Sequence, residues 1–161
     1  MVKRYDGSPL LAEQLWTEIE KAYTKKGRIY HNLHHIDALY ALLLNYQSKI
    51  ADWDTLCFSI IYHDIIYSVR RSDNEERSAQ FAADRLAQLN YPISKIEVCR
   101  AQIIATKSHG DTDDNDTNLF TDADLAILGS DWETYEQYAK AIRKEYRIYP
   151  KLPFIFLRRR F

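Results

Sequence analysis

The chain has 161 residues, of which 46% are hydrophobic and 28% are charged, a balance typical of one soluble globular domain. Its 22 basic and 23 acidic side chains give a formal net charge of -1, which argues against nucleic acid or an anionic membrane as the main partner. Only 4 glycines and 4 prolines interrupt the chain, and this scarcity favours long helices over an all-β fold with many turns. We therefore expect a single all-α domain over residues 1–161, built from about six or seven helices.

Neither the N-terminal segment nor any apolar run predicts an exported or membrane protein. Charged residues interrupt Met1 to Leu15, where a leader would be apolar, and the apolar stretch Leu56 to Tyr62 is far too short to span a bilayer. Cys57 and Cys99 lie in apolar helical contexts, and two buried thiols are typical of a reducing compartment rather than of a disulfide framework. The sequence thus indicates a cytoplasmic protein. It leaves a homodimer open.

Apolar spacing predicts three helices in the first half of the chain. Apolar residues at every fourth position from 11 to 23 predict the first helix. The second begins near His31, and the third begins at a cap formed by Asp52 or Asp54. Because its Leu56–Tyr62 segment is apolar on all sides, the third helix is expected at the centre of the fold.

Capping patterns predict three more long helices and one short helix in the second half. The predicted helix starts are Asp73 with Glu76, Ser94 with Glu97, and Ser130 with Glu133. The second of these helices is expected to continue to about His109, where Gly110 ends it. An acidic loop over 111–118 and a short helix over 122–128 should separate it from the last long helix. No segment alternates between apolar and polar residues in the manner of a strand.

The histidines of the chain lie in or beside these helices, together with several aspartates. They are His31, His34 and His35, then His63 next to Asp64, then His109, followed downstream by Asp122 and Asp124. Imidazole and carboxylate groups are costly to bury unless they are paired or bind a metal ion. Divalent ions accept such mixed nitrogen and oxygen ligands. The set therefore predicts a divalent-metal site, with Mn, Fe, Zn, Mg, Ni and Co all open as the ion.

The spacing of these residues limits which of them can bind one metal ion, but it does not establish that they bind one. On a helix, His31 and His35 would share one face, whereas His34 would point about 100° away from His35. The same three histidines are also compatible with polar residues at an exposed helix start. The pair formed by His63 and Asp64 would satisfy both groups inside the core even without a metal ion.

The order of these motifs resembles the HD-domain superfamily of metal-dependent phosphohydrolases, in which a His, an adjacent His-Asp pair and a distant Asp follow one another. More narrowly, five blocks are similar to those of an uncharacterised bacterial family of predicted HD phosphohydrolases, over roughly residues 10–150. These blocks are Tyr30–Ile36, Tyr62–Asp64, Asp73–Ala79, Ala105–His109 and Asp122–Gly129.

The resemblance implies a helical HD-type domain with a defined ligand set. The implied metal ligands are His35, His63, Asp64 and Asp124, with Asp122 left open as an alternative to Asp124. The Tyr30–His35 block also resembles the opening motif of cyclic-nucleotide phosphodiesterases, which implies that His31 is the general acid and His34 has no role. The implied catalytic residues are thus His31 and Asp64.

Two further residues carry substrate-binding expectations. Lys107 and His109 would hold phosphate oxygens of the substrate or complete a second metal position. For Lys107, an exposed cation at a helix end is an equally good interpretation.

The implied activity is hydrolysis of a phosphoester, in a nucleotide or a small phosphorylated metabolite, by a metal-activated water. An unligated imidazole could protonate the leaving oxygen. The rival interpretations are a sensor module that binds metal and nucleotide without turnover, and a helical structural protein. Relatives continue into another helical segment where this chain has the proline-containing stretch from Pro150 to Phe161, so the C-terminal end is expected to be atypical.

Overall fold

The computed structural model describes residues 8–150, and within this range it contains seven α-helices and no strand. They are α1 (Pro9–Tyr23), α2 (Leu33–Leu44), α3 (Trp53–Tyr62), α4 (Asn74–Gln88), α5 (Ile93–Ala105), α6 (Asn115–Leu125) and α7 (Trp132–Glu145), with short 3-10 helices η2 (Gln47–Lys49) and η3 (Ala126–Gly129). The all-α expectation and the expected number of helices are confirmed. The atypical end predicted from Pro150 onward falls almost entirely outside the described residues.

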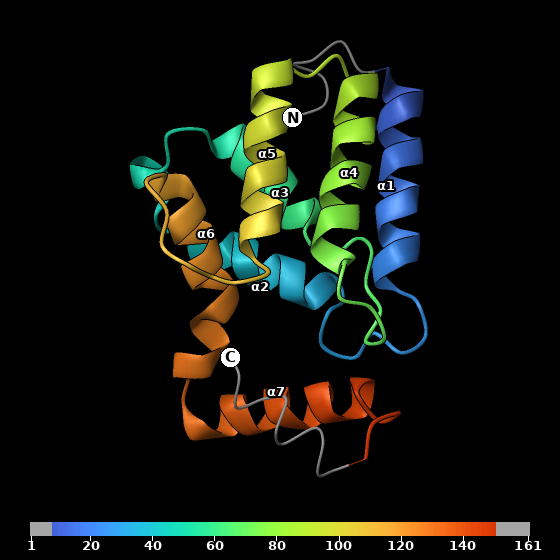
Figure 1. The fold of residues 1–161 in the computed structure, drawn as a ribbon, viewed down its shortest axis with the longest axis vertical. Helices are drawn as coiled ribbons and strands as arrows, with labels where there is room; N and C mark the ends of the chain where they lie inside the picture. The colour runs from blue at the N-terminus through green and yellow to red at the C-terminus, as the bar shows by residue number, and fades with distance from the viewer. Residues whose placement is uncertain (1–7, 151–161) are drawn as a thin grey trace.

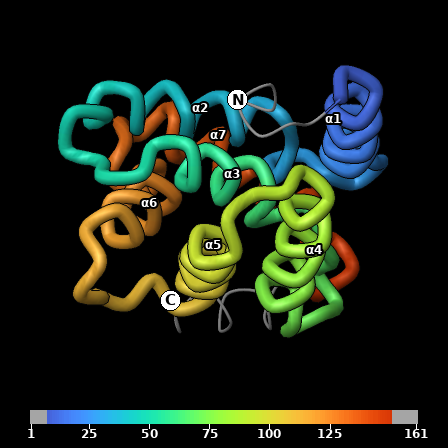
Figure 2. The backbone as a smooth tube through the Cα atoms, turned by 90° about the horizontal axis from the view of Figure 1, so that it is seen from above, coloured from blue at the N-terminus to red at the C-terminus, as the bar shows by residue number. Residues whose placement is uncertain are grey.

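The third helix, α3, lies at the centre of the fold, as its sequence predicted. It packs against α2, α4, α5 and α6, which surround it when the molecule is seen from above (Figure 2). Its side chains are buried at positions 55–60 and at Tyr62. In Figure 1, α1, α4 and α5 run side by side, α2 crosses near their lower ends, and α7 lies across the bottom of the molecule.

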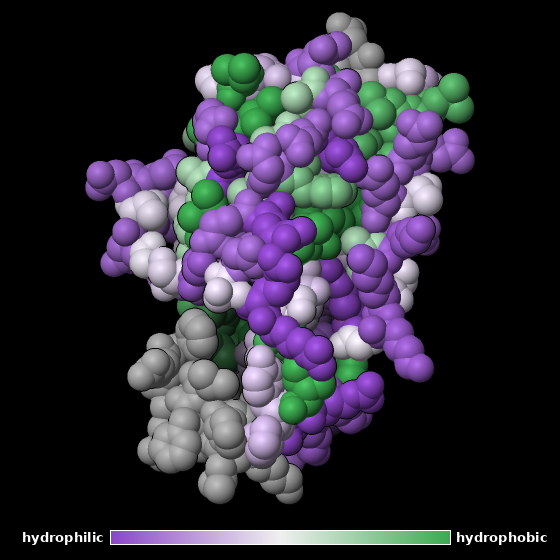
Figure 3. Space-filling model, turned by 45° about the vertical axis from the view of Figure 1, so that its right-hand side comes forward, coloured by the Kyte–Doolittle hydropathy of each residue, from purple (hydrophilic) through white to green (hydrophobic). Residues whose placement is uncertain are grey.

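Apolar side chains of α1 to α6 form one core between these helices. On the face drawn in Figure 3, hydrophilic side chains predominate and hydrophobic ones appear between them in separate groups. This distribution follows from amphipathic helices that turn their apolar faces inward. Cys57 and Cys99 are buried free thiols within this helical assembly.

Two aspartates fix the start of α3. Asp52 is its N-cap and accepts a hydrogen bond from the backbone N–H of Thr55 at 3.2 Å. Asp116, buried on α6, accepts the backbone N–H groups of Ala51 and Asp52 at 2.9 Å each. Because its start is tied to α6, α3 is held at a fixed position, and so is its C-terminal end, where His63 and Asp64 lie.

The three predicted capping pairs do not form, although helices begin near all three positions. The observed N-cap residues are Asp73 for α4, Pro92 for α5 and Asp131 for α7, and only Asp131 makes a side-chain capping bond. Two of the expected carboxylates have other partners, since Glu76 pairs with Lys107 and Glu97 pairs with Arg100. Basic side chains, whether distant or near in sequence, therefore bind these carboxylates in place of the helix N-termini.

The boundaries around the predicted acidic loop also differ from expectation. Helix α5 ends at Ala105, and α6 begins at Asn115, inside the segment predicted as a loop over 111–118. The cause is Asp114, whose side chain accepts the backbone N–H of Thr117 at 2.9 Å and so starts a helix. The short helix predicted over 122–128 is the end of α6 together with η3.

Over the described range 8–150, no helix has both the length and the apolar character that crossing a bilayer requires.

Candidate metal centre

His63 lies at the end of α3, and one of its two ring nitrogens is hydrogen-bonded to the backbone. His63 is the C-cap residue and is only 2% exposed. Its Nδ1 lies 2.9 Å from the carbonyl oxygen of Ile60. Since a carbonyl oxygen only accepts hydrogen bonds, Nδ1 carries a proton, and the lone pair of the neutral ring lies on Nε2. This arrangement is the one expected of a metal-binding histidine, whose other nitrogen donates to a backbone carbonyl.

Potential ligand atoms from His35, His63 and Asp64 converge on one place. The Nε2 atoms of His35 and His63 are 3.2 Å apart, and Asp64 Oδ2 lies 3.3 Å from His63 Nε2. Ligand atoms of the three residues all lie within 4.8 Å of one another. Two atoms bound to one ion at about 2.0–2.1 Å are separated by roughly 3 Å. The three side chains are therefore spaced so that they could hold a metal ion.

Asp124 on α6 faces the same place. Its Oδ1 lies 3.2 Å from His35 Nε2 and 3.8 Å from His63 Nε2, and its Oδ2 lies 2.9 Å from His109 Nε2. Asp122, two residues earlier, is exposed. Of the two aspartates that the sequence left open, Asp124 is thus the one that contacts the histidines.

The charges around these atoms fit a bound cation. Burial alone would raise the pKa of Asp64, but His63 and His31 hold it far below its usual value. Burial would also raise the pKa of Asp124, which hydrogen bonds from His109 and His35 keep well below the ordinary range. Two carboxylates thus remain ionised in a partly buried setting, where they need positive charge beside them. A divalent ion bound by nitrogen and oxygen ligands would supply that charge.

His31 lies beside this cluster but not on the helix that was expected to carry it. Helix α2 begins at Leu33, and Asn32 is its N-cap in an extended backbone conformation, so His31 precedes the helix. The expectation that His31 and His35 share a helix face is therefore wrong. Their rings nevertheless lie 5.8 Å apart between centroids, and His31 Nε2 is 4.0 Å from Asp64 Oδ2. His34 is exposed on α2, as predicted for a residue without a role in the cluster.

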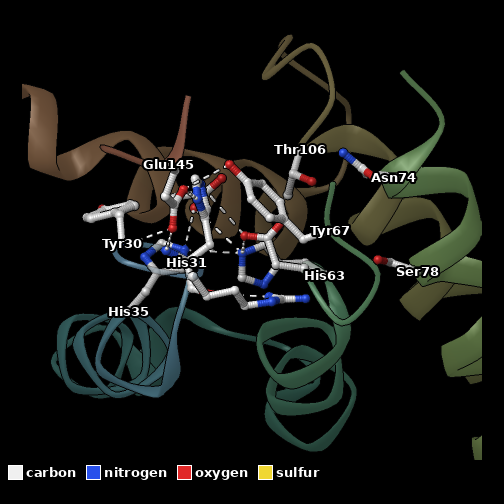
Figure 4. A network of polar contacts seen from close by, with 12 residues as sticks. Tyr30, His31, His35, His63, Tyr67, Asn74, Ser78, Thr106 and Glu145 are labelled. Carbon is white, nitrogen blue, oxygen red and sulfur yellow. Dashed lines mark hydrogen bonds and ion pairs between the residues drawn. The ribbon is translucent and has the colours of Figure 1, made fainter. Parts of the chain in front are cut away.

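Glu145, at the end of α7, holds His31 in place (Figure 4). One carboxylate oxygen, Oε1, accepts the backbone N–H groups of Ile29, Tyr30 and His31 at 2.6, 2.8 and 3.1 Å. The other, Oε2, lies 2.7 Å from His31 Nδ1 and 3.0 Å from the hydroxyl of Tyr67. Burial would raise the pKa of Glu145, but these hydrogen bonds and the nearby imidazole lower it to about 2.

No motif or spacing in the sequence predicted a role for Glu145. It follows Arg143 and Lys144 at a helix end, where a charged residue is ordinarily solvated. Its partner His31 is 114 positions away along the chain. The contact between Glu145 and His31 becomes apparent only from the packing of α7 beside the segment that precedes α2.

The two predicted substrate-binding residues differ in their placement. His109 joins the cluster through its hydrogen bond with Asp124. Lys107 is instead paired with the carboxylate of Glu76 and donates to the backbone carbonyl of Ser72 at 2.7 Å. Among residues 8–150, no ion pair or hydrogen bond joins Lys107 to the histidines, so its placement agrees with the alternative of an exposed cation at a helix end.

Metal binding at this cluster is expected to release protons and to strengthen as the pH rises. Burial would lower the pKa of His63, but the negative charges of Asp64 and Asp124 raise it to about 9 in the metal-free protein. A metal ion needs the Nε2 lone pair and must displace that proton. Affinity should therefore increase by about tenfold per pH unit below that pKa for each proton displaced. Calorimetric titration in buffers of different ionisation enthalpy measures the released protons, and an affinity that does not change between acidic and alkaline pH would contradict the prediction.

Comparison with known proteins gives no family for this chain: no family model, no curated protein and no solved structure matches it. The resemblance to HD phosphohydrolases thus stays a prediction made from the motifs.

Proposed function

We propose that the protein is a metal-dependent phosphohydrolase that cleaves a phosphoester in a nucleotide or a small phosphorylated metabolite. The proposed ligands of the divalent ion are His35, His63, Asp64 and Asp124. The observation that carries the proposal is the position of His31. It lies beside the ligand cluster, yet its Nδ1 is engaged by Glu145 and its Nε2 is 4.0 Å from Asp64 Oδ2.

This position suits a proton donor better than a structural ligand. A site that only holds an ion needs no additional imidazole beside its ligands. An imidazole whose Nδ1 is bound to a carboxylate keeps Nε2 available, and Nε2–H can be donated to the leaving oxygen of a phosphoester. After that transfer the ring is neutral and still donates through Nδ1 to Glu145.

Each part of the site has a separate chemical task in this proposal. When bound, the divalent ion would supply a Lewis acid for a phosphoryl oxygen and lower the pKa of a water molecule. Asp64 and Asp124 provide the negative charge that holds the ion, and His109 holds Asp124 at 2.9 Å. His63, fixed by the carbonyl of Ile60, keeps its lone pair directed at the same place.

The test begins with the metal content of the purified protein, measured by elemental analysis. A panel of phosphomonoesters, nucleotides and cyclic nucleotides is then assayed with added manganese and with a chelator. The proposal expects bound divalent metal and turnover that the chelator abolishes. The variant His34→Ala is the control for substitutions near the site. Because His34 is exposed, this variant should keep both the metal and the turnover.

Two results would contradict the proposal in different ways. A protein that binds metal and nucleotide but hydrolyses nothing on the panel would be a sensor module. A protein that binds no divalent metal, even when metal is added, would have no site of the proposed kind.

A further inference from the structure

We propose that Glu145 is a positioning residue for His31: it fixes which ring nitrogen carries the proton and turns the other toward Asp64. The inference rests on the proposed function, in which His31 Nε2–H is donated to the leaving oxygen. In the described part of the chain, Glu145 contacts His31, and His31 in turn lies beside the ligand cluster. Glu145 would therefore act through His31 and not on the substrate.

The carboxylate of Glu145 is surrounded by groups that donate to it. Three of its partners are backbone N–H groups, which can only donate, and a fourth is the hydroxyl of Tyr67. The side chain is 1% exposed, so these bonds replace the water that an ionised carboxylate would otherwise require. An acceptor of this kind forces His31 to donate through Nδ1, which leaves Nε2 as the nitrogen on the side of Asp64.

Aromatic rings fix the plane of the His31 imidazole but not its tautomer. The ring of Tyr67 lies against it with centroids 4.3 Å apart, and Tyr30 meets it edge-on at 5.1 Å. These contacts are the same whichever nitrogen is protonated. The choice of tautomer therefore depends on the hydrogen bond with Glu145.

Attachment of α7 does not depend on Glu145 alone. The rings of Tyr138 on α7 and Tyr30 are 4.7 Å apart, and the hydroxyl of Tyr149, just after α7, donates to the carbonyl of Val69 at 2.9 Å. Changing the chemistry of the Glu145 side chain should therefore leave the helix in place. This allows its effect on His31 to be measured separately from a loss of structure.

Replacing Glu145 with glutamine separates its binding of the backbone N–H groups from its effect on the His31 tautomer. The amide oxygen can still accept the three backbone N–H groups, because the reverse orientation would set an NH₂ group against three donors. The NH₂ group then faces His31 Nδ1 and donates to it, so the neutral ring carries its proton on Nε2. Protonating the ring in that state would place two donors against each other, and the acid form of His31 becomes unfavourable.

The first experiment reads the tautomer directly, by ¹H–¹⁵N correlation spectra of histidine-labelled protein with and without zinc, at alkaline pH where the ring is neutral. The His31 signals are assigned by their loss in His31→Ala. We expect Nδ1–H in the wild type and Nε2–H in Glu145→Gln. The matched control is Glu136→Gln, which makes the same change on α7 at an exposed carboxylate that pairs with Lys140. It should leave the tautomer unchanged.

The second experiment measures turnover of phosphoesters with good and poor leaving groups. Glu145→Gln should lower kcat for poor leaving groups by up to the roughly 10²–10⁴-fold typical of general acid catalysis, with little change in KM. The double variant His31→Ala/Glu145→Gln should lose no more than His31→Ala alone, because one change already removes what the other disturbs. Losses that multiply would indicate a structural role and overturn the proposal.

The tautomer decides the proposal even if no phosphoester is hydrolysed. In that case the proposed function fails, whereas a switch from Nδ1–H to Nε2–H still supports the positioning role. An Nε2–H tautomer in the wild type, or an unchanged tautomer in Glu145→Gln, overturns it. Should Glu145→Gln fail to fold, an Nε2–H tautomer in the wild-type spectrum still overturns the proposal, and an Nδ1–H tautomer supports it.

Discussion

Replacing Asp64 with alanine is expected to abolish stable metal binding and all metal-dependent turnover. Asp64 Oδ2 lies 3.3 Å from His63 Nε2 and is the carboxylate closest to the end of α3. Its loss would remove both a proposed ligand and a negative charge from a largely buried site. Even partners that only orient ligands are typically worth about 10–100-fold in metal affinity, so removing a ligand should cost at least about 100-fold. Elemental analysis after dialysis and calorimetric titration with manganese or zinc measure the effect.

A pair of variants on α6 provides the control for this ligand set. Asp124→Asn should also weaken metal binding, because its carboxylate contacts His35 and His109. Asp122→Asn makes the same chemical change two residues away at an exposed position and should leave affinity unchanged. Full metal occupancy in Asp64→Ala would show that the ligand assignment is wrong. An equal loss in both α6 variants would show the same for Asp124.

Much of the architecture was predictable because apolar spacing reflects burial directly. The apolar run from Leu56 to Tyr62 predicted a central helix, and α3 is surrounded by four other helices. The candidate ligands were predictable for a related reason. Imidazoles and carboxylates next to such a run must be paired or bound, so the sequence alone predicts a shared site for His63 and Asp64.

Helix starts were less predictable, because local capping patterns compete with partners that are distant in sequence. Glu76 matched a capping pair but pairs with Lys107, 31 positions away. His31 was placed on a helix by its spacing from His35. In the structure the backbone N–H groups of residues 29–31 bind the Glu145 carboxylate, and the helix begins only at Leu33.

Replacing His31 with alanine is expected to preserve metal binding while removing most of the turnover. His31 contributes no atom to the group formed by His35, His63 and Asp64, and its Nδ1 is committed to Glu145. The change should therefore remove a proton donor and no ligand. General acid catalysis is typically worth about 10²–10⁴-fold, and a loss of that size is expected for phosphoesters of alcohols, whose leaving oxygen needs a proton.

The dependence on the leaving group distinguishes an acid from a residue that merely supports the fold. A nitrophenyl phosphoester leaves as a stable anion, so its hydrolysis by His31→Ala should be reduced far less than that of an alkyl ester. The matched variant His34→Ala, at an exposed position three residues further along, should hydrolyse both at the wild-type rate. Equal losses for the two substrates in His31→Ala would argue against proton donation. Complete loss of bound metal in that variant would instead indicate that His31 is a ligand, because a proton donor makes no bond to the ion.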